Sequence, residues 1–144
     1  MRDISTTVAA GRVRTKGLPI WSACLFLVLI LVPAALTAAP RPDLMSYFQS
    51  GFTDTAYQQG CLNKVRKSWR SPAHWAKPGS KAVVLSAIGR DGKLINATLS
   101  TKSGSKEWDD AALSAVKGAA PFEKLPAGFA GDNLQVHWHF SVLP

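Results

Sequence analysis

Cysteine and catalytic motifs are both scarce in this chain. It has 144 residues and two cysteines, Cys24 in an apolar run and Cys61 in a predicted helix, so no intrachain disulfide is expected. The sequence contains no nucleophile elbow, no P-loop and no pair of carboxylates suited to acid–base catalysis. Asp109 and Asp110 are adjacent and would lie about 100° apart on a helix. These absences argue against an enzyme and against a bound cofactor.

Acidic residues are also few. Nine acidic residues stand against 17 basic ones, which gives a formal net charge of +8. Basic side chains gather at Lys64, Arg66, Lys67 and Arg70, which indicates either a solvated helix face or attraction to anionic lipid or an acidic partner. Nucleic acid is not an expected partner, because these residues are not interleaved with aromatics and no nucleic-acid-binding motif is present.

Charge is absent altogether between Lys16 and Arg41. The apolar run Leu18–Leu36 has 19 residues, close to the ~20 that span a bilayer, and basic residues precede it. Two interpretations stay open: an uncleaved inner-membrane anchor, or a cleaved signal peptide. The anchor is favoured because cleavage after Ala39 would place Pro40 at the scissile bond. Both interpretations export the rest of the chain, to the periplasm in a bacterium with two membranes.

The exported part alternates helical and strand patterns. The predicted segments are a cytoplasmic basic terminus (1–17), an anchor or signal (18–39), a short linker or pre-helix (40–56) and a folded domain (57–144). The predicted elements within the domain are a helix at 55–69, strands at 81–90 and 93–101, a helix at 106–119 and a strand at 133–143. This order predicts a small α+β domain: helix, hairpin, helix, strand, with a three-stranded antiparallel sheet and two helices on one face.

The turn Asp91–Gly92 predicts a two-residue hairpin and fixes its register. The expected apolar face pairs residues 88 with 95, 86 with 97, and 84 with 99; the other face pairs 87 with 96, 85 with 98, and 83 with 100. Ser105 and Asp54 are expected helix N-caps. In the last strand apolar residues alternate with polar ones, which predicts one buried face.

The ordered set of features resembles the carboxy-terminal domain of the TonB and TolA proteins of bacterial envelopes, and the TolA-type branch in particular. The resemblance covers about residues 57–144. It rests on Trp69 with Pro72, Asp91–Gly92, Ser103–Gly104, Asp110–Ala111–Ala112, Pro121–Phe122, Leu125–Pro126 and the final strand.

The resemblance implies a binding role without catalysis. Such a domain pairs with segments of outer-membrane receptors or other envelope proteins, and its N-terminal helix engages the inner membrane; a homodimer stays open. Coupling to a membrane motor is not expected, because roughly 18 residues of spacer extend at most ~60 Å and the apolar run has no histidine.

Peptide addition at an open strand edge fits this role, since unpaired backbone groups there await a partner. The sequence points to the last strand as that edge, with Gln135, His137, His139 and Ser141 as the partner-binding residues. The alternative is an exported small-ligand or metal-binding protein that uses His137, His139 and the loop aromatics, with Cys61 or His74 as further ligands of a metal. No metal site is predicted, because such sites need three or four convergent ligands.

Overall fold

A computed structural model describes residues 39–49 and 51–144 of the chain, and the expected anchor or signal lies almost wholly outside them. The elements are β1 (Arg41–Phe48), α1 (Thr55–Ser68), β2 (Lys81–Gly89), β3 (Leu94–Thr101), α2 (Lys106–Gly118) and β4 (Asn133–Leu143). Within the described residues, none of the helices is long and apolar enough to cross a membrane.

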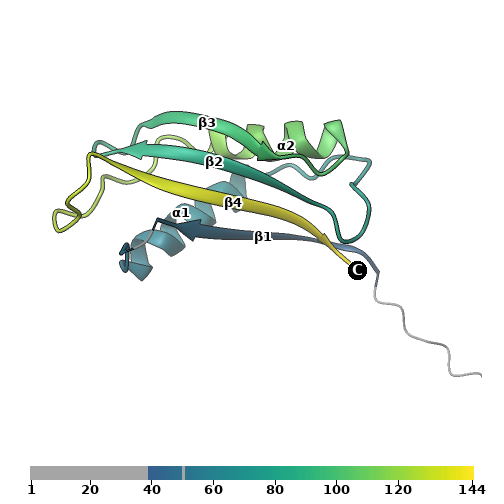
Figure 1. Cartoon of the computed structure of the whole chain (residues 1–144), viewed down its shortest axis with the longest axis horizontal. Coiled ribbons are helices and arrows are strands. Elements are labelled where there is room, and N and C mark those ends of the chain that lie inside the picture. Colours follow the sequence, from purple (N-terminus) through teal and green to yellow (C-terminus); the bar gives the residue numbers. More distant parts are fainter. Residues whose placement is uncertain (1–38, 50) are drawn as a thin grey trace, which may run out of the picture. The chain divides into compact units, whose positions relative to one another are not determined.

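The sheet has four antiparallel strands in the order β1-β4-β2-β3, and both helices lie on one of its faces (Figure 1). The predicted α+β class and its helical face are confirmed, but the expected three strands are wrong. The fourth strand, β1, comes from the segment expected to be a linker or pre-helix. It pairs along its whole length with β4, from Arg41 opposite Leu143 to Phe48 opposite Val136. The segment 40–56 therefore belongs largely to the folded domain.

The hairpin register follows the turn over its middle four pairs, which run from Val84 opposite Leu99 to Ala87 opposite Asn96. Both ends of the hairpin depart from the prediction, because the register shifts there. Ile88 lies opposite Leu94 instead of Ile95. The shift turns Ile95 away from the core, and this residue is 62% exposed.

Both expected N-caps are confirmed. The Asp54 carboxylate accepts a hydrogen bond from the Tyr57 backbone N–H at 2.9 Å, and the Ser105 hydroxyl accepts one from Trp108 N at 3.4 Å. Each bond satisfies a backbone donor that the first turn of a helix leaves unpaired. The second cap is supported by the buried Asp109, whose carboxylate accepts from Ser103 N at 2.8 Å.

The core fills the space between the helices and the inner face of the sheet. The predicted alternation in β4 is confirmed: its apolar residues are buried and its polar residues face outward. Trp138 stands at the centre of this face and is fully buried. The inward residues of α1 are Tyr57, Cys61 and Val65. Cys61 is thus a small apolar core residue with a free thiol.

Alkaline pH is expected to destabilise the domain through two of these residues. Burial, with a smaller contribution from the negative charge of Glu123, raises the pKa of the Cys61 thiol from 9.0 to about 11, against the opposing effects of Tyr57 and Lys64. Burial also raises the pKa of Tyr57 above its usual value of 10.0. Both groups keep their protons in the folded state over a range in which the unfolded chain releases them.

The stability that these groups contribute is therefore complete below pH 9 and declines as pH rises through the folded pKa of Cys61, about 11. Urea unfolding at successive pH values should show the free energy of unfolding falling over this window. Cys61→Ala should flatten the fall between the two pKa values of Cys61, and Tyr57→Phe should flatten its upper part. An unchanged slope in both variants would contradict the assignment.

Candidate partner-binding site

The last strand is not an open edge. β4 lies between β1 and β2 and pairs with both, so its backbone groups are used on either side. The expectation that β4 offers an edge to a partner is wrong, because β1 occupies the position where a partner strand would lie. Gln135, His137, His139 and Ser141 instead present their side chains on the outer face of an interior strand.

The two histidines lie among aromatic and apolar neighbours on that outer face. Tyr47 lies opposite His137 in the register, and its ring centroid is 4.6 Å from that of His139. Burial lowers the pKa of His139, and the positive charge of Lys81 and the neighbouring His137 lower it further. All three effects favour the neutral form of the His139 imidazole.

The other residues considered for a metal site lie elsewhere. Cys61 is buried on the inner side of α1, and His74 Nδ1 is 3.3 Å from a carboxylate oxygen of Glu107. Over residues 39–49 and 51–144, no group of three or more histidine, cysteine, aspartate or glutamate side chains is placed to hold a metal ion. Among the described residues, the structure therefore does not bring together the set of ligands that a metal site would need.

The free edges of the sheet are β1 and β3 (Figure 1). The pairing of β3 with β2 shifts register twice, between Val83 and Val84 and between Ala87 and Ile88. Such irregularities twist an edge strand and oppose the addition of another chain. The pairing of β1 with β4 has no shift over eight residues. The regular free edge of the domain is therefore β1.

The backbone groups that β1 turns outward follow from its hydrogen bonds. Gln49 N, just beyond the strand, donates to Gln135 O at 3.0 Å. Hydrogen-bonded and non-bonded pairs alternate along an antiparallel ladder. The peptide groups of Leu44, Ser46 and Phe48 therefore point away from β4, toward the open edge. Pro42 has the same orientation. It has no backbone N–H, but this position would point its N–H away from β4, so the β1–β4 ladder loses no hydrogen bond.

A groove of about 380 Å³ runs beside this edge, between β1 and α1. Its lining combines strand backbone with apolar, amide and charged side chains, from Asp43, Leu44, Met45, Ser46, Tyr47, Gln58, Gln59, Leu62 and Arg66. An extended segment beside β1 would thus meet Leu62 as an apolar contact and Arg66 as a cation. None of these α1 residues was anticipated as functional, since their role depends on a strand that the sequence did not reveal.

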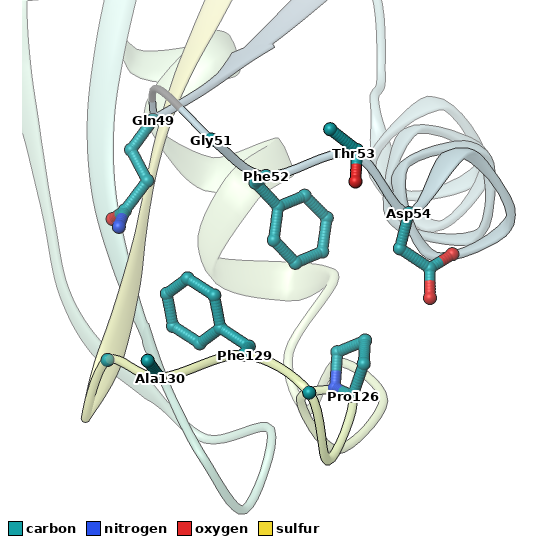
Figure 2. A pocket seen from close by; sticks show the side chains of 10 residues that line it. Gln49, Gly51, Phe52, Thr53, Asp54, Pro126, Phe129 and Ala130 are labelled. Carbon is teal, nitrogen blue, oxygen red and sulfur yellow. The ribbon is translucent and has the colours of Figure 1, made fainter.

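A larger pocket, of about 520 Å³, lies where β1 ends and β4 begins, and it is called the end pocket below (Figure 2). It is formed by two loops, one between β1 and α1 and the other between α2 and β4. The rings of Phe52 and Phe129, one from each loop, meet edge to face with centroids 5.7 Å apart. The lining residues are Gln49, Gly51, Phe52, Thr53, Asp54, Pro126, Gly128, Phe129, Ala130 and Gly131.

Three comparisons bear on the family. The family model described as TonB C terminal matches residues 54–138, more than half of the chain. Protein TonB of Pasteurella multocida (strain Pm70) is 31% identical over 94 residues, which are 64% of this chain and 37% of that protein. The chain thus spans little more than a third of the length of this curated relative.

A solved structure, the solution NMR structure of TolAIII bound to a peptide derived from the N-terminus of TolB, shares 26% sequence identity with a TM-score of 0.48. It covers 61% of this chain and 75% of that one. The family match begins at Asp54, so it includes α1 and excludes β1. By the family match, which spans both helices and the strands β2, β3 and most of β4, this chain belongs to the TonB C-terminal domain family.

Proposed function

We propose that this domain is a non-catalytic protein-interaction module of the bacterial envelope that binds an extended segment of a partner by strand addition along β1. The observation that carries the proposal is a regular, unpaired strand edge with a groove beside it. In strand addition, backbone hydrogen bonds supply affinity and neighbouring pockets supply specificity. The β1 edge offers unpaired backbone groups, and the groove offers side chains that can select the partner.

The groove favours a particular kind of segment. The outward peptide groups of Leu44, Ser46 and Phe48 would pair with every second residue of the added strand. Leu62 favours an apolar side chain on the partner, and Arg66 favours a carboxylate, which a guanidinium can bind in a bidentate manner. The expected partner segment is therefore extended and alternates apolar residues with at least one acidic residue.

Membership of the TonB C-terminal domain family supports a place in the envelope, and the apolar run after a basic N-terminus supports export. The domain would lie in the periplasm, held near the inner membrane if the apolar run is retained. Its partner would be an outer-membrane receptor or another envelope protein. The family match also supports a role in transport across the envelope.

Site-specific photo-cross-linking of the full chain in living cells tests the proposal. A photoreactive side chain replaces Met45, which is 52% exposed on β1, and in a matched variant it replaces the exposed Thr98 on β3. Irradiation should yield an adduct with an envelope protein from the β1 position, and mass spectrometry of the adduct should identify an extended segment. Adducts from Thr98 alone would move the site to the other edge.

A proline substitution tests the backbone contribution. Ser46→Pro removes an N–H that points outward, so it should spare the β1–β4 ladder and abolish the adduct. Tyr47→Pro removes an N–H that points toward β4 and should instead weaken the sheet, which circular dichroism and urea unfolding would show. An undiminished adduct in folded Ser46→Pro protein would overturn strand addition at this edge.

A further inference from the structure

Side-chain hydrogen bonds fix both loops of the end pocket. Gln58 Nε2 donates to Phe52 O at 3.0 Å and fixes the first loop from α1. Arg90 Nη2 donates to Phe129 O at 2.8 Å and fixes the second loop from the hairpin. Gln49 Oε1 accepts from Gln135 N at 2.9 Å and joins the floor of the pocket to β4. Hydrogen bonds from three different parts of the fold therefore fix the lining of the pocket.

The lining has a distinct chemistry. Figure 2 shows the rings of Phe52 and Phe129 next to each other in the lining, with Pro126 on the same loop as Phe129. Aromatic rings favour another ring at their edges or faces, and they also attract a cation. Asp54, at the start of α1, is the single ionisable residue among those that line the pocket. Its carboxylate caps α1 and supplies the one acidic group in the lining of the pocket.

Two of the three glycines in the wall leave space that a side chain would fill. A Cβ added at Gly128 or Gly51 would meet no atom within 4 Å. Gly51 has a φ of +86°, which a side chain would strain, whereas Gly128 has no such restriction. Gly128 is thus a residue of the pocket lining that can take a side chain without a steric clash.

We propose that the end pocket is a binding subsite for an aromatic side chain next to a cationic group on a partner segment. The pocket begins at Gln49, the residue after the end of β1, so a segment paired along β1 would reach it. The inference rests on the proposed function in naming the partner as a peptide segment. It goes beyond strand addition, since it assigns side chains that the edge itself does not select.

Small probes test the subsite separately from the edge. Phenethylamine carries a ring and an ammonium group, and 3-phenylpropionate carries the same ring with a carboxylate. Each is titrated into the isotope-labelled full chain in a non-ionic detergent, and the backbone amide signals of Gly128, Phe129 and Gly131 are followed by NMR. Phenethylamine should shift these signals in a saturable manner, with an affinity at least about fivefold above that of phenylpropionate, the effect of one charge about 4 Å away in bulk water.

Two substitutions should remove this binding by different routes. Gly128→Leu fills the cavity and should weaken phenethylamine at least about tenfold, the cost of losing a well-packed ring contact. Asp54→Asn keeps an efficient N-cap and should make the two probes bind equally. Ala127→Leu is the matched control: Ala127 is exposed and does not line the pocket, so binding should be unchanged.

The outcomes separate the two proposals. Ser46→Pro should leave probe binding intact, because the subsite does not use the β1 edge. Probe binding without cross-links at β1 would sink strand addition alone. Cross-links at β1 with no saturable shift, or with equal binding of both probes to the unmodified chain, would overturn the subsite alone. Undiminished binding of phenethylamine by Gly128→Leu would also overturn the subsite.

Discussion

Trp138→Ala should leave the domain at or beyond the margin of stability. Trp138 is 0% exposed, and its ring stacks on that of Phe122 with a centroid distance of 6.1 Å. Its Nε1 donates to the hydroxyl of the buried Ser86 at 2.8 Å. Removal of a buried tryptophan costs about 3–5 kcal/mol, while small domains unfold with about 5–15 kcal/mol in total. Far-UV circular dichroism in urea should show a large drop in the unfolding midpoint, or no folded baseline.

Two further variants separate the causes. His137→Ala changes the neighbouring residue, which faces outward, and its free energy of unfolding should stay within about 0.5 kcal/mol of the unmodified domain. Trp138→Phe keeps most of the ring volume but removes the donor to Ser86. Its free energy of unfolding should lie between those of Trp138→Ala and His137→Ala. The expected loss is about 1–3 kcal/mol, from the unmet polar group of Ser86 and the smaller ring. Equal stability of Trp138→Ala and His137→Ala would contradict the assignment of the core.

The local signals in the sequence were sufficient for most of the fold. Asp54 and Ser105 predict the starts of the two helices, because their side-chain oxygens accept hydrogen bonds from backbone N–H groups of the first turns. Asp91–Gly92 sets the hairpin, and Asp91 supports the turn further by accepting from Lys93 N at 3.0 Å. Each of these features depends on residues within a few positions of one another. The register of the four middle pairs of the hairpin and the buried face of β4 follow for the same reason.

The strand β1 could not be read in the same way. Its inward residues are Leu44, Ser46 and Phe48, while Met45 and Tyr47 face outward. Because large apolar residues occur on both faces, the segment has no clean alternation, and it suggested a short helix instead. The strand is defined by pairing with β4, almost 100 residues later in the chain, and such pairing leaves little trace in the local pattern.

This missed strand moved the candidate site. The reasoning that a partner joins an open edge did not change, but β1 covers the edge of β4 and exposes its own. The end pocket was missed for a related cause. Its two loops are remote in sequence, and they meet through the contact of Phe52 with Phe129. The glycines at 128 and 131 signalled a loop, without indicating what that loop faces.

Gly92→Ala should be the most damaging single-methyl change in the hairpin. Gly92 has a φ of +83°, and a Cβ built there would lie 2.3 Å from the carbonyl oxygen of Phe122. The contact is with backbone, so rotation of a side chain cannot relieve it. Two carbonyl groups of this turn also accept hydrogen bonds from the loop after α2. Phe122 N donates to Gly92 O at 2.8 Å, and Leu125 N donates to Arg90 O at 3.1 Å. The added methyl would push the loop after α2 away from the hairpin that holds it.

Gly79→Ala is the matched control, because Gly79 has nearly the same φ, +84°, and nothing within 4 Å of an added Cβ. It isolates the strain of the left-handed backbone, expected to cost about 1–2 kcal/mol. Gly92→Ala should cost about 2 kcal/mol more, from the steric contact and the loss of loop hydrogen bonds. Urea unfolding of both variants measures the difference. Because Arg90 also fixes Phe129 O, Gly92→Ala should weaken phenethylamine binding at the end pocket while Gly79→Ala should not; equal effects of the two changes would show that the hairpin does not support the pocket.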